Sequence, residues 1–416
     1  MNIEQMARDA KSASRVLAKA PTSLKNRALR EMAKALRRRA GKILTANGRE
    51  LAAVRKTARS AAFVERMTLN GKRIENIARA LEHVAGLSDP VGKTTAFGLR
   101  PNGLNIKRMR VPLGVVAIIY ESRPGVTADA AGLCIKSGNA AILRGGKETV
   151  LTNSVIADAL REGLKKAGLP PSSVGFVNDP DRAAVRELLQ LDTLIDLVIP
   201  RGGPELTTAV RHESLIPVLA HDKGLCHTYI DEKADLAMAL NIAFNAKAER
   251  PGVCNAMETL LVHEKIAKRF LPLMAEKYSA GGVELRGDPK TRKILPGIKA
   301  ASEKDWDTEY LALILSVKVV KNMDEALAHI AKHGSGLAEA IVTSDKSRAA
   351  RFLKEADAGA VYHNASTRFT DGGEFGLGAE MGISTQKLHA RGPVALEGLT
   401  CEKFVVHGRG QVRCST

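Results

Sequence analysis

The spacing of hydrophobic residues changes once along the chain, near residue 110. Residues 3–85 carry apolar side chains at helical spacing, for example Met32, Leu36 and Ile43. From residue 111 onward, short continuous apolar runs such as 114–120 alternate with segments of helical spacing. Continuous apolar runs of this length are typical of buried parallel strands, which need crossover helices between them. The sequence therefore predicts a helical start followed by α/β structure.

The α/β part divides into two series of elements. The first predicts a five-stranded doubly wound sheet, with strands at 114–120, 140–143, 174–177, 194–199 and 216–220. The second predicts strands at 258–263, 311–320, 338–344 and 359–364, with helices at 234–248, 265–278, 323–332 and 346–356. A chain of 416 residues also exceeds what one hydrophobic core usually supports. We therefore expect two doubly wound parallel α/β domains.

Two segments fit neither predicted sheet. They are residues 105–111 and a last strand near 402–406. Exposed strands of this kind tend to pair with another edge or with a partner subunit. They predict a small oligomerisation β element and a homo-oligomer.

Composition narrows the class of protein. No stretch approaches the ~18 apolar residues that a membrane span needs, and the basic start has no apolar signal core. The five cysteines are scattered and form no C-x-x-C pair, and the histidines lack metal-ligand spacing. These features predict a cytoplasmic protein with reduced thiols, no disulfide framework and no metal site.

The net charge of +18 is concentrated at the start of the chain. Residues 1–110 contain 25 Lys and Arg but 8 Asp and Glu. A solvated basic helix face is the favoured interpretation, and a polyanion-binding surface is the alternative. Interleaved aromatic residues and a nucleic-acid motif are both missing, so no nucleic-acid partner is expected. A basic field could also attract phosphorylated small molecules.

The sharpest local signal for chemistry is the segment 245–255, NAKAERPGVCN. A predicted helix ends there, Pro251 and Gly252 favour a turn, and Cys254 follows just before a strand. A thiol in such a turn could be activated by loop N–H groups and basic neighbours. A small buried hydrophobe is the alternative. Cys134, on an apolar helix face, is expected in the core, while Cys226 is ambiguous.

Two glycine-containing turns follow strands of the first series. No G-x-G-x-x-G follows the first strand, so the usual dinucleotide fingerprint is absent. Arg144-Gly145-Gly146-Lys147 follows the second strand, and Pro200-Arg201-Gly202-Gly203-Pro204 follows the fourth. Each could be only a tight turn, but ligands bind at the carboxyl ends of parallel strands. The polar stretch 364–373 is either a solvated loop or a ligand loop.

Together these segments resemble the aldehyde dehydrogenase superfamily, and within it most closely the family of gamma-glutamyl phosphate reductases. The resemblance covers essentially the whole chain and rests on seven blocks in order. They are VPLGVVAIIYESRP (111–124), SGNAAILRGGKE (137–148), DLVIPRGG (196–203), GLCHTYID (224–231), NAKAERPGVCNAMETLLVHE (245–264), NASTRFTDGGEFGLGAE (364–380) and STQKLHARGP (384–393).

The resemblance implies a role for each matching residue. Cys254 corresponds to the nucleophile. Arg144, Gly145, Gly146 and Lys147 would hold the adenosine ribose and 2′-phosphate of NADPH, with Gly202 and Gly203 at the second turn and Glu309 at the nicotinamide ribose. Ser366, Thr367 and Arg368 correspond to a substrate loop, and Ser122 and Arg123 to a region that could supply an oxyanion donor.

The resemblance also implies a reaction, the NADPH-dependent reduction of L-glutamate 5-phosphate to its semialdehyde in proline biosynthesis. Hydrolytic relatives carry a glutamate base after the fifth strand, whereas residues 219–224 contain no Glu. Asp222 or Glu249 could replace that base. A hydrolytic semialdehyde dehydrogenase is therefore the alternative enzyme, and a polyanion-binding protein the alternative from another class.

The domain roles follow from the resemblance. Residues 1–104 and 112–225 are expected to form the cofactor-binding domain and 226–378 the catalytic domain, with oligomerisation strands and tail at 105–111 and 379–416. The expected partners are an acyl phosphate substrate, further copies of this chain and the kinase that makes glutamyl phosphate.

Overall fold

A computed structural model describes residues 2–57, 59–221 and 223–413 of the chain. Its contacts divide the chain into two compact units. Unit 1 contains the residues up to Leu219, Leu377–Gly382 and the residues from Val394 onward, and unit 2 contains Ala220–Gly376 and Ile383–Pro393. The chain thus enters unit 2 shortly before the predicted boundary at 225. Each unit is an α/β structure built on its own parallel sheet.

Unit 1 contains a parallel sheet with strand order β5-β4-β3-β6. Its strands are β3 (Val115–Tyr120), β4 (Ala140–Arg144), β5 (Val174–Phe176) and β6 (Leu197–Arg201), and the helices between and after them are α6 (Gly125–Lys136), α7 (Val150–Ala167), α8 (Arg182–Leu189) and α9 (Pro204–Glu213). The prediction of a fifth strand at 216–220 is wrong. That segment makes one bridge, between Val218 and Val198. Pro217 has no N–H to donate, so the ladder does not extend.

The start of the chain folds into the predicted helices. They are α1 (Ile3–Leu17), α2 (Thr22–Arg38), α3 (Ala40–Val54), α4 (Ala61–Met67) and α5 (Gly71–Gly86). Helix α1 packs against the sheet, and α2 packs against α7. Gly163 permits this close packing, because a Cβ there would lie 2.4 Å from the backbone N of Met32. These helices therefore belong to the core of unit 1.

The densest basic stretch of the chain lies on α2 and just after it. The Arg37 guanidinium bonds the carboxylates of Glu75 and Glu82. Arg38 and Arg39 both pair with Glu162, at 2.8 and 2.9 Å. Exposed pairs of this kind contribute at most about 1 kcal/mol each. The arrangement fits a solvated helix face with partial charge compensation. Among the described helices, none is both long and apolar enough to cross a membrane.

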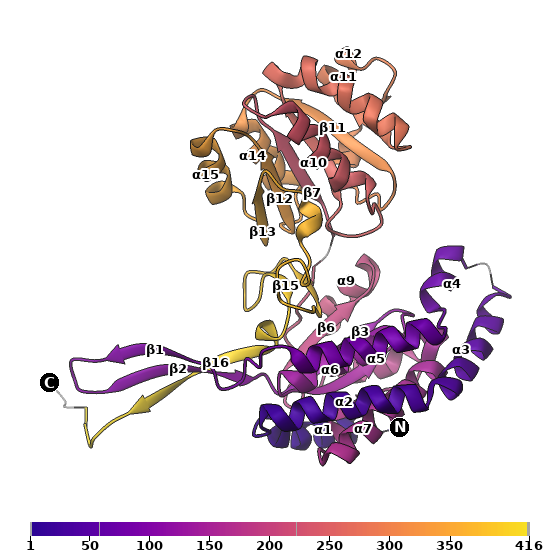
Figure 1. The fold of residues 1–416 in the computed structure, drawn as a ribbon, viewed down its shortest axis with the longest axis vertical. Helices are drawn as coiled ribbons and strands as arrows, with labels where there is room; N and C mark the ends of the chain where they lie inside the picture. Colours follow the sequence, from indigo (N-terminus) through magenta and orange to yellow (C-terminus); the bar gives the residue numbers. More distant parts are fainter. Residues whose placement is uncertain (1, 58, 222, 414–416) are drawn as a thin grey trace. The chain divides into compact units, whose positions relative to one another are not determined.

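The segments that fit neither predicted sheet form a separate antiparallel sheet in unit 1. Its strands are β1 (Thr94–Leu99), β2 (Asn105–Pro112) and β16 (Thr400–His407), in the order β1-β2-β16. Figure 1 shows this sheet extending away from the helices of unit 1. The prediction that 105–111 and the last strand lie outside both parallel sheets is confirmed, and β1 joins them.

Unit 2 contains a parallel sheet with strand order β10-β9-β11-β8-β7-β12-β13. Its strands are β7 (Cys226–Ile230), β8 (Met257–His263), β9 (Glu284–Gly287), β10 (Lys299–Ala300), β11 (Ile314–Val320), β12 (Ala338–Val342) and β13 (Ala360–His363). The pattern missed β9 and β10, because strands of four and two residues are too short for a periodic signal.

Two helix layers cover this sheet. Helices α10 (Leu236–Ala248) and α11 (Glu264–Ala280) cover one face, where Leu260 and Val262 point. Helices α14 (Met323–His333) and α15 (Lys346–Glu355) cover the other, where Tyr229 and Leu261 point. The remaining described elements are α12 (Pro289–Ile294), α13 (Glu303–Trp306), β14 (Gly382–Ser384), β15 (Gly392–Val394) and the 3₁₀ turns η1 (Lys147–Thr149), η2 (Pro171–Ser173), η3 (Thr367–Phe369) and η4 (Glu397–Leu399).

Candidate active site

Cys254 lies in the turn that joins α10 to β8, at the amino end of the strand. Helix α10 ends at Ala248 and β8 begins at Met257, with the predicted turn at Pro251 and Gly252 between them. The Cys254 residue is half-buried. A turn of this kind holds a thiol at the end of the sheet and leaves it partly accessible to a small molecule.

Two of the other described cysteines are buried, which disfavours their thiolates, and the third is exposed on another sheet. Burial raises the pKa of Cys134 to about 12 and raises the pKa of Cys226 well above its ordinary value. The Cys226 thiol donates to the carbonyl oxygen of Cys254 at 3.4 Å, so it supports the turn. Cys401 is exposed on β16, and Cys414 lies outside the described residues. Within unit 2, the half-buried Cys254 is the better candidate for a reactive thiol.

The predicted substrate loop anchors the residue after the thiol. The Thr367 hydroxyl donates to the carbonyl oxygen of Asn255 at 2.8 Å, and the Arg368 guanidinium bonds the Asn255 side-chain oxygen. The Asn255 amide in turn donates to the carbonyl oxygen of Thr370 at 2.9 Å. Sequence reasoning missed Asn255, although it directly follows Cys254. The structure thus brings Cys254, Ser366, Thr367 and Arg368 into one neighbourhood.

The side chains of this loop differ in what they can offer a ligand. Thr367 is fully buried, and Ser366 is 4% exposed and accepts the N–H of Arg368 at 3.3 Å. Both therefore shape the loop. The Arg368 side chain pairs with the exposed carboxylate of Glu249 at 3.0 Å. An anionic ligand could compete with that exposed partner for the guanidinium.

Glu309 is linked to the turn that carries Cys254 by a contact with Gly224. The Gly224 N–H donates to the Glu309 carboxylate at 3.0 Å, and burial raises the pKa of Glu309. A Cβ at Gly224 would lie 2.1 Å from the Cys254 carbonyl oxygen, so glycine is required there. The structure therefore brings Glu309 and Cys254 close together within unit 2. Asp222, the alternative base beside this glycine, lies outside the described residues.

The second group of predicted residues lies at the carboxyl edge of the unit 1 sheet. Arg144 ends β4, and its guanidinium donates to the Pro180 carbonyl oxygen at 2.9 Å. Its Nε is buried without a partner among the described residues. Lys147 is exposed, and its ammonium forms no ion pair within the described part of the chain. A cation pair with an unsatisfied buried donor fits a phosphate group of a nucleotide cofactor.

The neighbouring turns pack tightly at the same edge. A Cβ at Gly146 would lie 2.3 Å from the Ser122 hydroxyl, which donates to Glu148 at 2.8 Å. The Gly203 N–H, just before α9, donates to Glu121 at 2.7 Å. Gly145 and Gly202 are equally crowded by Asn153 and Glu121, and Arg123 is exposed just before α6. The glycines therefore permit close packing of the chain with itself at both turns.

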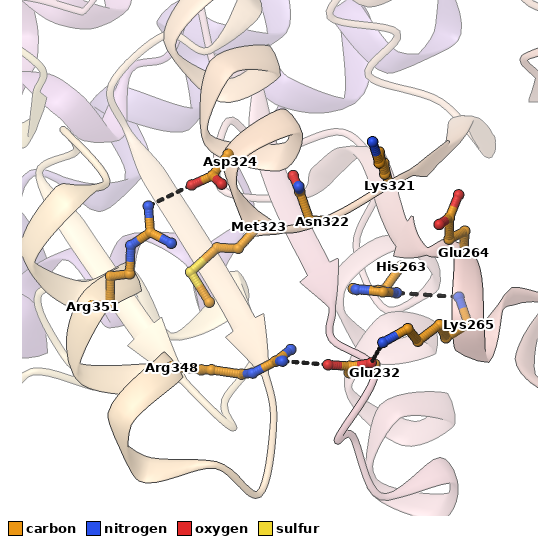
Figure 2. A pocket seen from close by; sticks show the side chains of 10 residues that line it. All are labelled: Glu232, His263, Glu264, Lys265, Lys321, Asn322, Met323, Asp324, Arg348 and Arg351. Atoms are coloured by element: carbon orange, nitrogen blue, oxygen red, sulfur yellow. Dashed lines mark hydrogen bonds and ion pairs between the residues drawn. The ribbon is translucent and has the colours of Figure 1, made fainter.

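A further hollow of about 400 Å³ lies at the carboxyl edge of the unit 2 sheet, where β7, β8 and β11 end. Figure 2 shows its lining: Glu232, His263, Glu264, Lys265, Lys321, Asn322, Met323, Asp324, Arg348 and Arg351. Lys265 and Arg348 pair with Glu232, and Arg351 pairs with Asp324. Carboxylates thus balance most of its cations, and the thiol lies at the other edge of the sheet. Among the described residues, no group of three or more His, Cys, Asp or Glu side chains is placed so that it could hold a metal ion.

Comparison with protein families gives one match across most of the chain. The model of the aldehyde dehydrogenase family matches residues 1–304 and 293–380. This chain belongs to the aldehyde dehydrogenase family. It is therefore an oxidoreductase, and members of this family use NAD or NADP.

Individual members of the family are similar over their full length. A gamma-glutamyl phosphate reductase of Caldanaerobacter subterraneus subsp. tengcongensis is 52% identical over 413 residues, which are 99% of this chain and 100% of that protein. The crystal structure of gamma-glutamyl phosphate reductase from Thermotoga maritima is 49% identical, covers 99% of this chain and 100% of its own, and has a TM-score of 0.97. The enzyme of that name from Saccharomyces cerevisiae is 32% identical, covers 100% of both chains and has a TM-score of 0.56.

Proposed function

We propose that this chain reduces L-glutamate 5-phosphate to L-glutamate 5-semialdehyde and phosphate, with Cys254 as the nucleophile and NADPH as the electron donor. The observation that carries the proposal is the setting of Cys254, a half-buried thiol in a turn anchored by the loop 366–370. Full-length relatives about half identical are named gamma-glutamyl phosphate reductase, which supports the substrate.

The reaction begins at the thiolate of Cys254. The sulfur attacks the acyl phosphate carbon, the bond to the phosphate oxygen breaks, and an acyl thioester remains on Cys254. When bound, a reduced nicotinamide would supply the hydride that reduces the thioester carbonyl. The thiohemiacetal on Cys254 then collapses, and the sulfur leaves with the electron pair of the carbon–sulfur bond. Oxyanion charge on the substrate needs a donor, for which we propose the Cys254 backbone N–H.

The cations have separate proposed tasks. Arg368 would bind the phosphate or the carboxylate of the substrate by exchanging its exposed partner Glu249. Ser366 and Thr367 would hold that loop in place. Arg144 and Lys147 would bind the 2′-phosphate that distinguishes NADPH from NADH, and Glu309 the nicotinamide ribose. Gly145, Gly146, Gly202 and Gly203 would shape the cofactor edge of unit 1.

A test follows from the fate of the thioester. Water attacks slowly without a positioned base, whose contribution is typically about 10² to 10⁴-fold. Residues 219–224, where hydrolytic relatives carry a glutamate base, contain no Glu, so we expect no efficient base there. Semialdehyde oxidation without phosphate should yield one NADPH per active site and then stop, and added phosphate should restart it. Cys254→Ser should abolish the burst. Sustained phosphate-free NADPH production would instead identify a hydrolytic dehydrogenase.

The remaining expectations concern the whole protein. A homo-oligomer, a cytoplasmic location and functional coupling to the kinase that makes glutamyl phosphate are part of the proposal. The exposed antiparallel sheet of unit 1 supports an oligomer.

A further inference from the structure

A buried ion pair joins the two ends of the turn that carries Cys254. Lys247 lies in the last turn of α10, and Glu258 is the second residue of β8. The Lys247 Nζ lies 2.6 Å from the Glu258 Oε2, and the two side chains are 0% and 1% exposed. The thiol turn at 249–256 is therefore closed at its base by two opposite charges.

This pair is in an unfavourable environment for charge. Burial lowers the pKa of Lys247 and raises the pKa of Glu258 to about 7. Desolvating an ion costs several kcal/mol, and apolar residues often replace buried pairs without loss of stability. Stability alone therefore explains the ion pair poorly, so its other contacts could indicate a further role.

The second oxygen of Glu258 reaches the loop that contains Glu309. Its Oε1 accepts the N–H of Leu311 at 3.2 Å. Leu311 has a φ of +52°, a left-handed conformation that is uncommon for a residue other than glycine. Two residues earlier, Glu309 accepts the N–H of Gly224, which itself packs against Cys254. One carboxylate thus touches both the base of the thiol turn and the Glu309 loop.

We propose that Glu258 is a positioning residue for the reaction. Its Oε1 fixes the strained Leu311 and so the carboxylate of Glu309 relative to Cys254, while its Oε2 is held by Lys247. Lys247 serves as the counter-ion that keeps Glu258 an acceptor. The inference deepens the proposed function, since it takes Cys254 as the nucleophile.

The test compares two double variants that both remove the ion pair. In Lys247→Met/Glu258→Gln, the amide oxygen can still accept from Leu311. In Lys247→Met/Glu258→Leu, that acceptor is lost. We expect the Gln variant to stay within several-fold of the wild-type kcat, and the Leu variant to lose about 10²-fold, the effect of an ångström-scale misplacement. The KM for the nicotinamide cofactor should rise in the Leu variant, because Glu309 moves.

A matched control lies in unit 1. Lys25 and Asp89 form another buried pair at 2.6 Å, and Asp89 also accepts a backbone N–H, from Val91 at 3.0 Å. Lys25→Met/Asp89→Asn and Lys25→Met/Asp89→Leu should alter the melting temperature without separating in kcat. The inference would be overturned if Lys247→Met/Glu258→Gln and Lys247→Met/Glu258→Leu had equal kcat and differed from the wild type in melting temperature alone.

Two further measurements keep the result independent of folding defects and of substrate. The charge reversal Lys247→Glu/Glu258→Lys restores the ion pair but places no acceptor opposite Leu311, so its kcat should fall as in the Leu variant. A wild-type kcat in the charge-reversed protein would refute the proposal.

Alkylation of Cys254 by iodoacetamide, followed over time by mass spectrometry, needs no substrate. Its rate should differ between the Leu and Gln variants. Equal alkylation rates would count against the positioning role. Failure of the wild-type protein to oxidise NADPH with glutamyl phosphate would instead reject the proposed function.

Discussion

Burial changes the chemistry of several single side chains in unit 2. His329 is 4% exposed, packs edge-on against Trp306 with ring centroids 5.3 Å apart, and has its Nδ1 3.3 Å from the Lys318 Nζ. Burial, together with the nearby His227, Lys318 and His333, lowers the pKa of His329 to about 2. The imidazole is therefore neutral in the folded protein, while an unfolded chain would protonate it near pH 6.5.

His329 should consequently make the protein sensitive to acid. Because the folded pKa lies below the unfolded one, stability from His329 is present above pH 6.5 and is lost as pH falls. Below pH 6.5, each further pH unit should lower the free energy of unfolding by up to about 1.4 kcal/mol through His329. Urea unfolding at pH 7.5 and 5.5 should show a smaller decrease for His329→Leu than for the wild type. His212→Leu, an exposed position on α9, is the control. An equal decrease in wild type and His329→Leu would contradict the assignment.

At the scale of elements, chemistry gathers where strands meet turns. In unit 1, β4 ends at Arg144, the chain turns at Gly145 and Gly146, and Lys147 begins the 3₁₀ turn before α7. Parallel strands place such turns at one edge of the sheet, where ligands of α/β folds bind. In unit 2 the thiol lies at the amino end of β8 instead, in a turn held by contacts from two other segments, 224–226 and 366–370.

The β4 turn yields a prediction about cofactor choice. Arg144→Ala/Lys147→Ala should raise the KM for NADPH by about tenfold or more over its effect on NADH, since charge-assisted bonds to a 2′-phosphate would be lost. Initial rates with both cofactors measure this. Lys165→Ala, an exposed cation at the far end of α7, should leave both KM values unchanged. Parallel increases for NADPH and NADH would refute the assignment of the 2′-phosphate to this turn.

At the scale of the whole molecule, the antiparallel sheet of unit 1 leaves apolar side chains exposed. Leu99 is 71% and Phe404 63% exposed, and Phe404 packs against Phe97 with ring centroids 5.7 Å apart. A cluster of exposed aromatic side chains on strands that project from a domain is typical of a subunit interface.

Disrupting this cluster should change the assembly and leave the fold intact. We expect Phe404→Glu to form a species of lower mass in light scattering after size-exclusion chromatography, because a carboxylate would have to be buried at the interface. Lys403→Glu, on the opposite face of β16 by strand alternation, should keep the wild-type mass. Circular dichroism would verify the fold of both variants. An unchanged mass for Phe404→Glu would exclude this face as the interface.

Local patterns in the sequence determined the helices at 3–85, the alternation of strands and helices, and the turn that carries Cys254. Each of these depends on residues close together in the chain, where periodicity and turn residues act directly. The strands β9 and β10 were missed, because two to four residues carry too weak a pattern. The predicted fifth strand of unit 1 failed because Pro217 has no N–H to extend the ladder. Only the tertiary structure placed Thr367 and Arg368 on Asn255, Glu309 on Gly224, and Glu258 between Lys247 and Leu311. Those contacts join segments up to 113 residues apart, and the order of strands in the sheet decides which segments meet.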